Sequence, residues 1–186
     1  DVGSKSGNTP FSYAESRKSN NRFLVYDVDR PTAYVGSFQA RSRTGYADGR
    51  WHHVCMTWKA EGDDGKGEMY VDGELVSLPG KGSHFSKIMR ADGAAVLGQE
   101  QDKVGGGFSN AQAYEGRLNR LNVFDRYMTA EDCAEVQRDV CAFADRTKCG
   151  GNVLSWDDVV SGVEDALDVP EADRASCGSY VQVGAG

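Results

Sequence analysis

The chain has 186 residues, which suits one principal domain with a short appendage, because a second independent core would need about a hundred more residues. Hydrophobic residues make up 39% of it, and 23 glycines interrupt the sequence often, as is typical of many short strands joined by tight turns. The formal net charge of −7, without a dense run of Lys and Arg, argues against a nucleic-acid partner and is compatible with cation binding.

The chain starts without Met, inside the polar stretch DVGSKSGNTP. We therefore expect a mature product or a segment of a longer protein. No apolar run approaches the roughly 20 residues that span a bilayer, so no membrane span is expected in this segment.

Most of the chain up to Phe124 shows short runs of alternating character, each bounded by Gly, Asp, Asn or Pro, which predict strands. The runs cover residues 11–16, 22–28, 32–38, 51–60 and 68–76. Within the fourth run, Val54, Met56 and Trp58 share one face that can enter a core, while the alternate residues meet a neighbouring layer. Segment 60–67 and the pair Asp72-Gly73 predict hairpin turns. The fold class predicted is therefore all-β, as an antiparallel two-sheet sandwich.

The pattern changes after Tyr127. Thr129 followed by Asp132 resembles a capping box and predicts one short helix over about 129–143. Its apolar stripe, which includes Cys133 and Val136, can pack against the sandwich.

The end of the chain carries weaker signals. The run GGNVLSW predicts a returning strand that places Trp156 in the core, and the last residues, VQVGAG, are expected to be frayed. We predict a sandwich over residues 1–160 and a Cys-containing C-terminal extension over 161–186.

Five cysteines are present, four of them in the last third of the chain, which is typical of oxidised secreted domains. They are Cys55, Cys133, Cys141, Cys149 and Cys177. No pair has the C-x₂-C spacing of a usual zinc site, so disulfides are favoured. The odd number predicts one thiol without a partner here, and Cys55 is the candidate.

Several ordered stretches resemble the pentraxin family. The run HHVCMTWKA resembles its signature, in which a His, a Cys two residues on and a Ser/Thr-Trp pair lie on one central strand. The runs GEMYVDGELV, AAVLGQEQDKVGGGF, EGRLNRLNVFDRYMTAED and GGNVLSW resemble later parts of the family in the same order. The likeness extends from about Phe11 to Trp156. It implies a jelly-roll sandwich of the pentraxin, laminin-G and concanavalin-like class that lacks its first strands.

The resemblance also bears on the cysteines. In pentraxins the signature Cys is bonded to a Cys on an earlier strand, which here would precede Asp1. The resemblance therefore implies that Cys55 is bonded to a Cys outside this sequence or on another chain; the alternative is a buried free Cys. The other four cysteines would then form two bridges, with three possible pairings.

The resemblance implies a calcium site. In the family, the loop matching Glu100-Gln101-Asp102 holds Ca²⁺ through two carboxylates and a backbone carbonyl, and an Asp-Asn pair aligned with Asn20 and Asn21 reaches the same ion. Hard oxygen donors of this kind are what Ca²⁺ prefers. We expect one ion at these five residues.

A second ion in the family uses positions that fall here on Ser109 and Gln112. Ser109 stands where the family has Glu, and Asn20 stands where it has Asp. Each departure removes one negative charge and weakens calcium binding. The second ion is therefore expected to bind more weakly.

The function implied is an extracellular, calcium-dependent recognition or adhesion module, lectin-like, in a secreted or cell-surface protein. Bound calcium would bridge to a glycan or phosphate-ester ligand, because an acidic protein by itself repels anions. The alternative is a structural domain that contacts other domains or chains of an extracellular assembly and binds no soluble ligand.

An enzyme is not expected. A concanavalin-like glycosidase would need two carboxylates flanking a sugar, and the candidates are Glu68 and Asp72, of which Asp72 lies in a predicted turn. The adjacent His52 and His53 point to opposite faces of a strand and cannot serve one metal ion.

Overall fold

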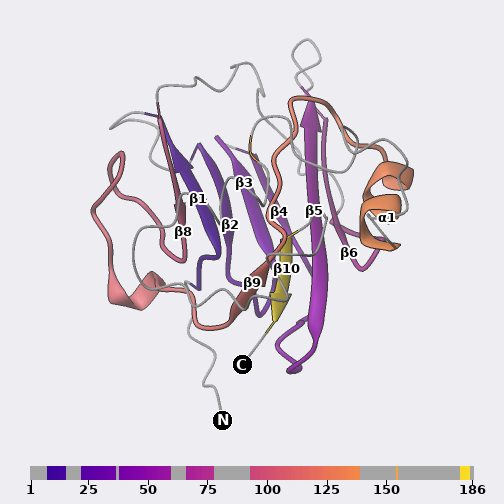
Figure 1. The fold of residues 1–186 in the computed structure, drawn as a ribbon, viewed down its shortest axis with the longest axis horizontal. Coiled ribbons are helices and arrows are strands. Elements are labelled where there is room, and N and C mark those ends of the chain that lie inside the picture. Colours follow the sequence, from indigo (N-terminus) through magenta and orange to yellow (C-terminus); the bar gives the residue numbers. More distant parts are fainter. Residues whose placement is uncertain are drawn as a thin grey trace.

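The computed structural model describes residues 8–15, 22–36, 38–59, 66–77, 93–138, 154 and 181–184. Their strands form two antiparallel five-stranded sheets packed face to face (Figure 1). One short α-helix, α1, lies outside this pair. The predicted all-β sandwich with one short helix is confirmed.

The first sheet has the strand order β4-β3-β2-β1-β8. Its strands are β1 (Phe11–Ala14), β2 (Phe23–Tyr26), β3 (Thr32–Val35), β4 (Phe38–Arg41) and β8 (Ala94–Leu97). Phe11 pairs with Val25 on one side and Leu97 on the other. The prediction of one strand over 32–38 is wrong: Gly36 adopts φ 59°, which glycine tolerates without steric cost, and turns the chain from β3 into β4.

The second sheet has the order β7-β6-β5-β10-β9. Its strands are β5 (Trp51–Lys59), β6 (Lys66–Val71), β7 (Glu74–Ser77), β9 (Arg117–Asn119) and β10 (Val181–Gly184). The predicted turn at Asp72-Gly73 is confirmed, because both residues have positive φ between the paired strands β6 and β7. Strands β5 and β6 pair as a hairpin, but residues 60–65 of the other predicted turn lie outside the described part, and residues 66–67 belong to β6.

The expectation that the last residues are frayed is wrong. Strand β10 pairs with β5 and with β9, so backbone groups of two strands far apart in sequence find partners through it. Leu154 forms an isolated bridge with Val123, whereas Trp156 lies outside the described residues. The proposed domain boundary near residue 160 stays a prediction for the same reason.

The core lies between the sheets and follows the predicted alternation along β5. Val54 is buried in it, and Met56 and Trp58 pack against it. The Trp58 ring lies 5.0 Å from that of Phe23 on the opposite sheet, centroid to centroid. Met69, from the neighbouring strand β6, is fully buried.

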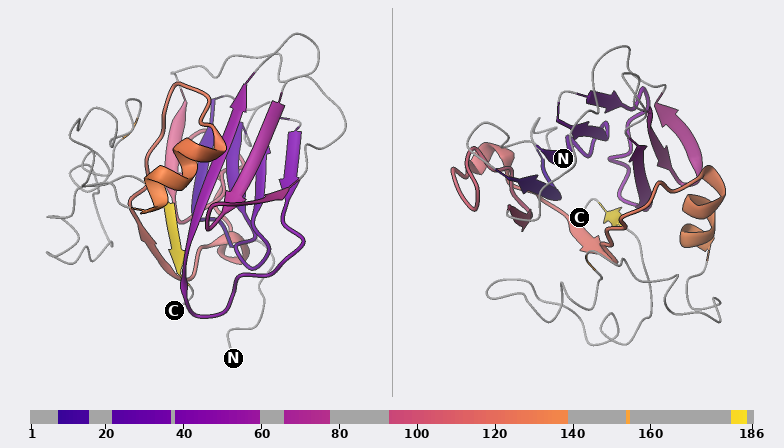
Figure 2. Two further views of the ribbon diagram at one scale, coloured as in Figure 1. Left: turned by 90° about the vertical axis from the view of Figure 1, so that its right-hand side faces the viewer. Right: turned by 90° about the horizontal axis from the view of Figure 1, so that it is seen from above.

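Helix α1 (Ala130–Arg138) lies on the outer side of the second sheet (Figure 2). It begins with a reciprocal capping box: the Asp132 N–H donates to Thr129 Oγ1 (3.2 Å), and the Thr129 N–H donates to the Asp132 carboxylate (2.7 Å). Residues 139–143 of the predicted helix lie outside the described part. No helix in the described ranges is both long and apolar enough to cross a bilayer.

A disulfide joins Cys55 of β5 to Cys133 of α1, with α-carbons 5.9 Å apart. The expectation that Cys55 bonds outside the chain or stays free is therefore wrong, and so is the assignment of Cys133 to a bridge among the last four cysteines. Cys55 is on the face of β5 opposite the core. Helix α1, which includes Val136, covers that face together with Met128. Closing a loop across 78 residues stabilises the fold by about 4 kcal/mol in the chain-entropy picture.

Cys141, Cys149 and Cys177 lie outside the described residues. Their pairing stays a prediction.

Candidate functional site

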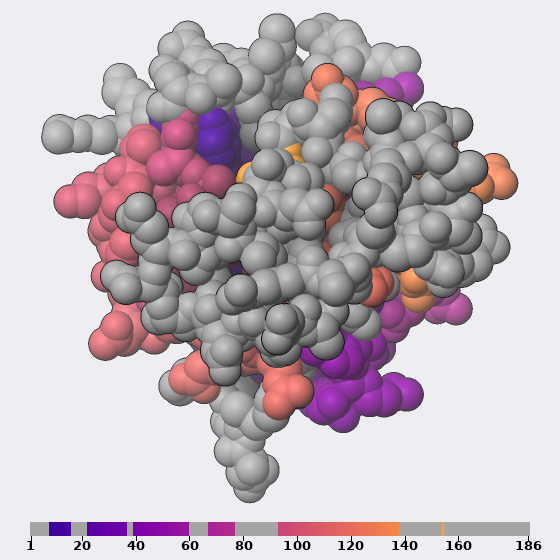
Figure 3. Space-filling view, in the orientation of Figure 1, coloured from indigo at the N-terminus to yellow at the C-terminus, as the bar shows by residue number. Residues whose placement is uncertain are grey.

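Residues 98–107, here called the acidic loop, follow strand β8. Glu100 and Gln101 are buried, at 2% and 0% exposure, whereas Asp102 is exposed. This segment reaches the surface of the molecule, in the pink region on the left of the space-filling view (Figure 3). The loop therefore presents one carboxylate to solvent and holds the other inside.

The Gln101 side chain fixes the fold of the acidic loop. Its Nε2 group donates to the Ser12 carbonyl (3.2 Å), to Ser12 Oγ (3.1 Å) and to the Ala94 carbonyl (3.0 Å). Its Oε1 accepts from the Gly105 N–H (2.8 Å). Ser12 Oγ in turn donates to the Gln99 carbonyl (2.6 Å). Because this side chain is occupied, Gln101 can offer an ion only its backbone carbonyl.

Glycine allows the acidic loop to close on itself. Gly107 has φ 77°, and a β-carbon there would lie 2.7 Å from the β-carbon of Asp102, so no larger residue fits without movement. Two backbone hydrogen bonds join Lys103 and Gly106, at 3.1 and 2.9 Å. The glycine-rich run thus packs against Asp102 and limits where its side chain can lie.

Of the other predicted ligands, Gln112 lies in the described part of the chain, whereas Asn20 and Asn21 do not. Gln112 ends the 3₁₀ helix η1 (Asn110–Gln112), and its carbonyl accepts from the Thr9 N–H (3.2 Å). The Gly98 N–H donates to the adjacent Pro10 carbonyl (3.1 Å), so the acidic loop and η1 are attached to the same end of β1.

Asn20 and Asn21 lie outside the described residues. The described ends of their segment are joined by an ion pair between Arg22 Nε and Glu15 Oε1 (2.9 Å). Glu15 directly follows Ala14, which pairs with Ala94, and Ala94 is where Gln101 attaches the acidic loop. The two halves of the predicted site are therefore connected to the same edge of the first sheet.

The donor chemistry of the acidic loop fits Ca²⁺. Glu100, Asp102 and the Gln101 carbonyl offer only hard oxygens, which suit Ca²⁺ and not zinc. Within the described ranges, no three His, Cys, Asp or Glu side chains converge as a metal site. Completion of the predicted site therefore depends on Asn20, Asn21 and backbone oxygens, and it stays a prediction.

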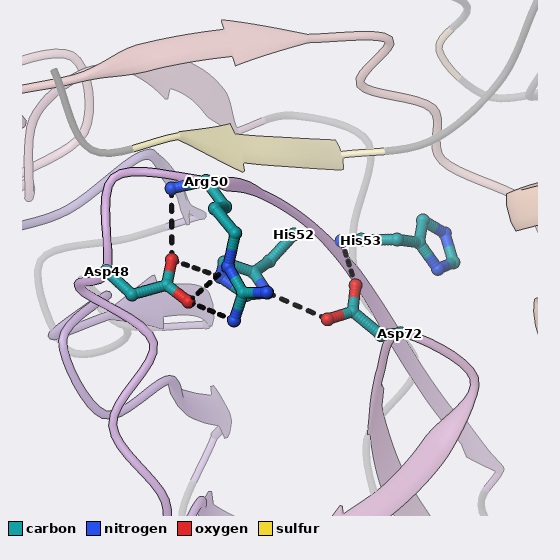
Figure 4. Close-up of polar contacts among 5 residues, drawn as sticks. All are labelled: Asp48, Arg50, His52, His53 and Asp72. Carbon is teal, nitrogen blue, oxygen red and sulfur yellow. Dashed lines mark hydrogen bonds and ion pairs between the residues drawn. The ribbon is translucent and has the colours of Figure 1, made fainter.

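A second polar group, here called the His52 cluster, consists of Asp48, Arg50, His52 and Asp72 (Figure 4). The His52 ring contacts two carboxylates, with Nδ1 2.7 Å from Asp72 Oδ2 and Nε2 2.9 Å from Asp48 Oδ1. Asp48 also accepts from the Arg50 N–H (3.0 Å) and from Arg50 Nε (2.6 Å). Asp72 also accepts from the His53 N–H (2.9 Å).

The two adjacent histidines have opposite protonation behaviour. Burial lowers the pKa of His52, but its hydrogen bonds to Asp72 and Asp48 outweigh burial and raise that pKa overall. Burial lowers the pKa of His53 to about 4, against a smaller effect of the Asp72 charge. The His53 ring points away from the cluster, so the two rings lie on opposite faces of β5, as predicted (Figure 4).

Sequence reasoning did not find the His52 cluster. The available signal was the hairpin register, because Val54 pairs with Val71 and the next residues, His53 and Asp72, therefore lie side by side. That register depends on how many residues the β5–β6 loop takes up, which the sequence pattern leaves open.

The two carboxylates weighed for glycosidase chemistry serve separate contacts. Glu68 accepts from the phenols of Tyr70 (2.9 Å) and Tyr127, whereas Asp72 belongs to the His52 cluster. Glu68 thus attaches the segment around Tyr127 to the second sheet, whereas Asp72 attaches the β6–β7 turn to β5.

Comparison with known proteins agrees with the fold and with the signature strand. The model of the Pentaxin family matches residues 4–169. The chain belongs to the pentraxin family. Sushi, von Willebrand factor type A, EGF and pentraxin domain-containing protein 1 of Rattus norvegicus is 36% identical over 162 residues, 87% of this chain and 4% of that protein. Neuronal pentraxin-2 of Homo sapiens is 33% identical over 153 residues, 81% of this chain and 33% of that protein.

Neuronal pentraxin-1 of Rattus norvegicus is 34% identical over 151 residues, 80% of this chain and 33% of that protein. The chain thus spans a third or less of the length of these relatives. What it shares with them is the pentraxin domain.

In this pentraxin domain, three residues of the signature strand make contacts that join it to other segments. His53 and Asp72 exchange hydrogen bonds, since the Asp72 N–H also donates to the His53 carbonyl (2.9 Å). Thr57 Oγ1 accepts from the Met128 N–H (2.7 Å), and Cys55 is bonded to Cys133. The His53 backbone therefore fastens the turn before β7, and the outward side chains of Cys55 and Thr57 fasten α1 and the segment that leads into it.

Proposed function

We propose that this pentraxin domain is an extracellular calcium-binding recognition module of a larger protein, with its ion site on the acidic loop. The observation that supports this most is the use of the Gln101 side chain as an internal anchor. It holds the loop by four hydrogen bonds, while Asp102 remains exposed next to the buried Glu100.

The residues that would hold the ion are Glu100, Asp102 and the carbonyl of Gln101, completed by Asn20 and Asn21. When bound, Ca²⁺ supplies positive charge at a surface whose own carboxylates repel anions. A loop that is already fixed loses little conformational freedom when the ion binds, and this favours affinity. Gln112 is the residue proposed for a weaker second ion.

The ligand class proposed is a glycan or phosphate ester that reaches the protein through the ion. The formal charge of −7 argues that an anionic ligand needs such a bridge. Recognition is proposed over catalysis because Glu68 and Asp72, the carboxylates considered for hydrolysis, are each committed to contacts within the fold.

Two observations support an extracellular setting within a longer protein. The Cys55–Cys133 disulfide is the kind of bond that persists in oxidising compartments. The relatives named above are much longer than this chain, so neighbouring domains or chains are the expected partners.

Calorimetric titration with Ca²⁺ of chelator-stripped protein tests the ion site, with a thermal melt beside it. Bound ion stabilises the fold by RT ln(1 + [L]/Kd), so a rise in melting temperature with Ca²⁺ is expected. The variant that combines Glu100→Gln with Asp102→Asn should lose the heat of binding and the rise in melting temperature. Glu74→Gln, an exposed acid on β7, is the matched control and should retain both.

Unchanged binding in the double variant would refute the assignment of the ion to the acidic loop. If the buried Glu100→Gln change prevents folding, Asp102→Asn alone serves as the test, and it should also lose Ca²⁺ binding. An array of glycans and phospholipids, probed with Ca²⁺ and with excess chelator, tests the ligand. Silence on the array with intact calcium binding would favour a structural domain that contacts other parts of an extracellular assembly.

A further inference from the structure

The geometry of the His52 ring carries an inference that is independent of calcium. A neutral imidazole has one N–H donor and one acceptor nitrogen, whereas the imidazolium has two donors. Both ring nitrogens of His52 face carboxylate oxygens, at 2.7 Å for Asp72 and 2.9 Å for Asp48. Loss of one proton would place a lone pair against a carboxylate at one of these contacts.

The His52 ring is shielded from solvent, so the repulsion between a ring lone pair and a carboxylate would be little screened by water. The His52 side chain is 9% exposed, while those of Asp48 and Asp72 are 36% and 41% exposed. The Tyr46 ring stands edge-on to it, with centroids 5.0 Å apart. The cation nearest to His52 in the sequence is Arg50, which is bonded to Asp48.

The neighbouring strands add no cation at His52 among the described contacts. Val183 of β10 is the residue paired with His52 in the backbone register. On β7, Glu74 is close enough for its charge to raise the pKa of Tyr46, a smaller effect there than burial and the Asp72 charge. The charges that decide the state of the ring are therefore the two aspartates.

We propose that Asp48, His52 and Asp72 form a proton-operated clamp. With two ring protons, the clamp joins the segment that precedes β5 to the turn between β6 and β7. With one proton, it releases one of the two carboxylates.

The carboxylate released is that of Asp48. Arg50 donates to Asp48 through its backbone N–H and through Nε, so the charge of Asp48 stays compensated when the ring no longer donates to it. Asp72 has one other described donor, the backbone N–H of His53, and its contact with the ring is the shorter one. The remaining ring proton is therefore expected on Nδ1.

The clamp ends on a turn that also touches helix α1. A β-carbon at Gly73 would lie 2.9 Å from Gln137 Oε1 and 4.0 Å from the Ala134 β-carbon. Asp72 and Gly73 therefore lie between the His52 ring on one side and α1 on the other. Opening at Asp48 leaves this turn in place and frees the segment before β5.

The direction of the response follows from the raised pKa of His52. The stability that the clamp contributes is fully present below the pKa of an unfolded histidine, about 6.5, and is lost as pH rises through the higher folded pKa. Mild acidification therefore closes the clamp.

Nuclear magnetic resonance of the whole chain, labelled at histidine and titrated from about pH 5 to pH 9, tests the proposal. The His52 resonance should titrate above the ordinary value of about 6.5, and above its midpoint the nitrogen shifts should show the Nδ1-protonated tautomer. Asp48→Asn should lower the midpoint, and Glu74→Gln should leave it unchanged. Backbone relaxation of residues 48–50 should report increased motion above the midpoint.

A His52 midpoint at or below the ordinary value, or one that Asp48→Asn leaves in place, would overturn the clamp. Unchanged motion of residues 48–50 across the midpoint would overturn the release of Asp48. These readings use the wild-type chain and a substitution at a partly exposed side chain, so they do not depend on a His52 variant that folds.

Discussion

The His52 cluster and the acidic loop both contain carboxylates, but the two regions use them differently. In the His52 cluster, each aspartate carboxylate accepts from an imidazole and from at least one further donor of the chain. In the acidic loop, an uncharged side chain, that of Gln101, makes the internal bonds, and Asp102 is left exposed.

The two regions show two uses of carboxylates in an acidic protein. Where the chain supplies its own cations, as Arg50 and His52 do, the acids fasten segments together and respond to protons. Where a neutral amide such as Gln101 does the fastening, the exposed Asp102 is the carboxylate that we propose meets a cation from solution. Substitutions in these two regions and at the neighbouring His53 test this division.

Replacing Gln101, the amide anchor, should lower the free energy of unfolding strongly. Gln101→Ala removes four hydrogen bonds and leaves the partners at Ser12, Ala94 and Gly105 without them, so a loss of about 3 kcal/mol in the free energy of unfolding is expected. Urea unfolding in chelator measures it. Gln112→Ala is the matched control and should stay within about 0.5 kcal/mol. Equal losses in the two variants would contradict the anchoring role.

The buried His53 should make the fold sensitive to acid. Its folded pKa of about 4 is below the unfolded value, so the unfolded chain binds the extra proton first, and stability falls as pH drops from about 6.5 to about 4. The loss approaches about 3 kcal/mol at 1.36 kcal/mol per pKa unit. Unfolding curves at several pH values measure it. His53→Gln should flatten the pH dependence, and an unchanged slope in that variant would contradict the assignment.

Neutralising the shared aspartate should have a smaller effect. Asp72→Asn weakens the contact with the His52 ring and the bond from the His53 N–H, but Asp72 is partly exposed, so a loss of about 1 kcal/mol is expected at pH 6. Because the His52 ring loses its charge at higher pH while its Nδ1–H contact with Asp72 remains, the loss should shrink, without vanishing, by pH 9. Glu74→Gln, measured in the same way, should change little. A loss that is the same at both pH values would show that the ring charge is not involved.

Neutralising the exposed acid of the loop should have the smallest effect on the fold itself. The Asp102 carboxylate makes no ion pair among the described contacts. The melting temperature of Asp102→Asn in chelator should therefore match that of the wild type. With Ca²⁺ present, its melting temperature should rise less than that of the wild type. An equal rise in both proteins would remove Asp102 from the proposed site.

Much of the fold could be predicted because local patterns carried it. The alternation along residues 51–59 indicated which face enters the core, and the Thr129–Asp132 capping box placed the start of α1. The acidic loop was predicted from its similarity to the pentraxin loop. Its anchoring by Gln101 was not predicted, since Ser12, one of the partners, is 89 residues away in the sequence.

Residue type and spacing over short stretches were enough to predict the all-β sandwich and the start of α1, and the resemblance to pentraxins pointed to the signature strand and the acidic loop. The folded structure was needed to show that Cys55 bonds to Cys133, that β10 enters the second sheet, and that His52 lies between Asp48 and Asp72. These contacts depend on strand register and on how the chain returns to the sheet. Periodicity shows which face a residue is on, but not which distant segment covers that face.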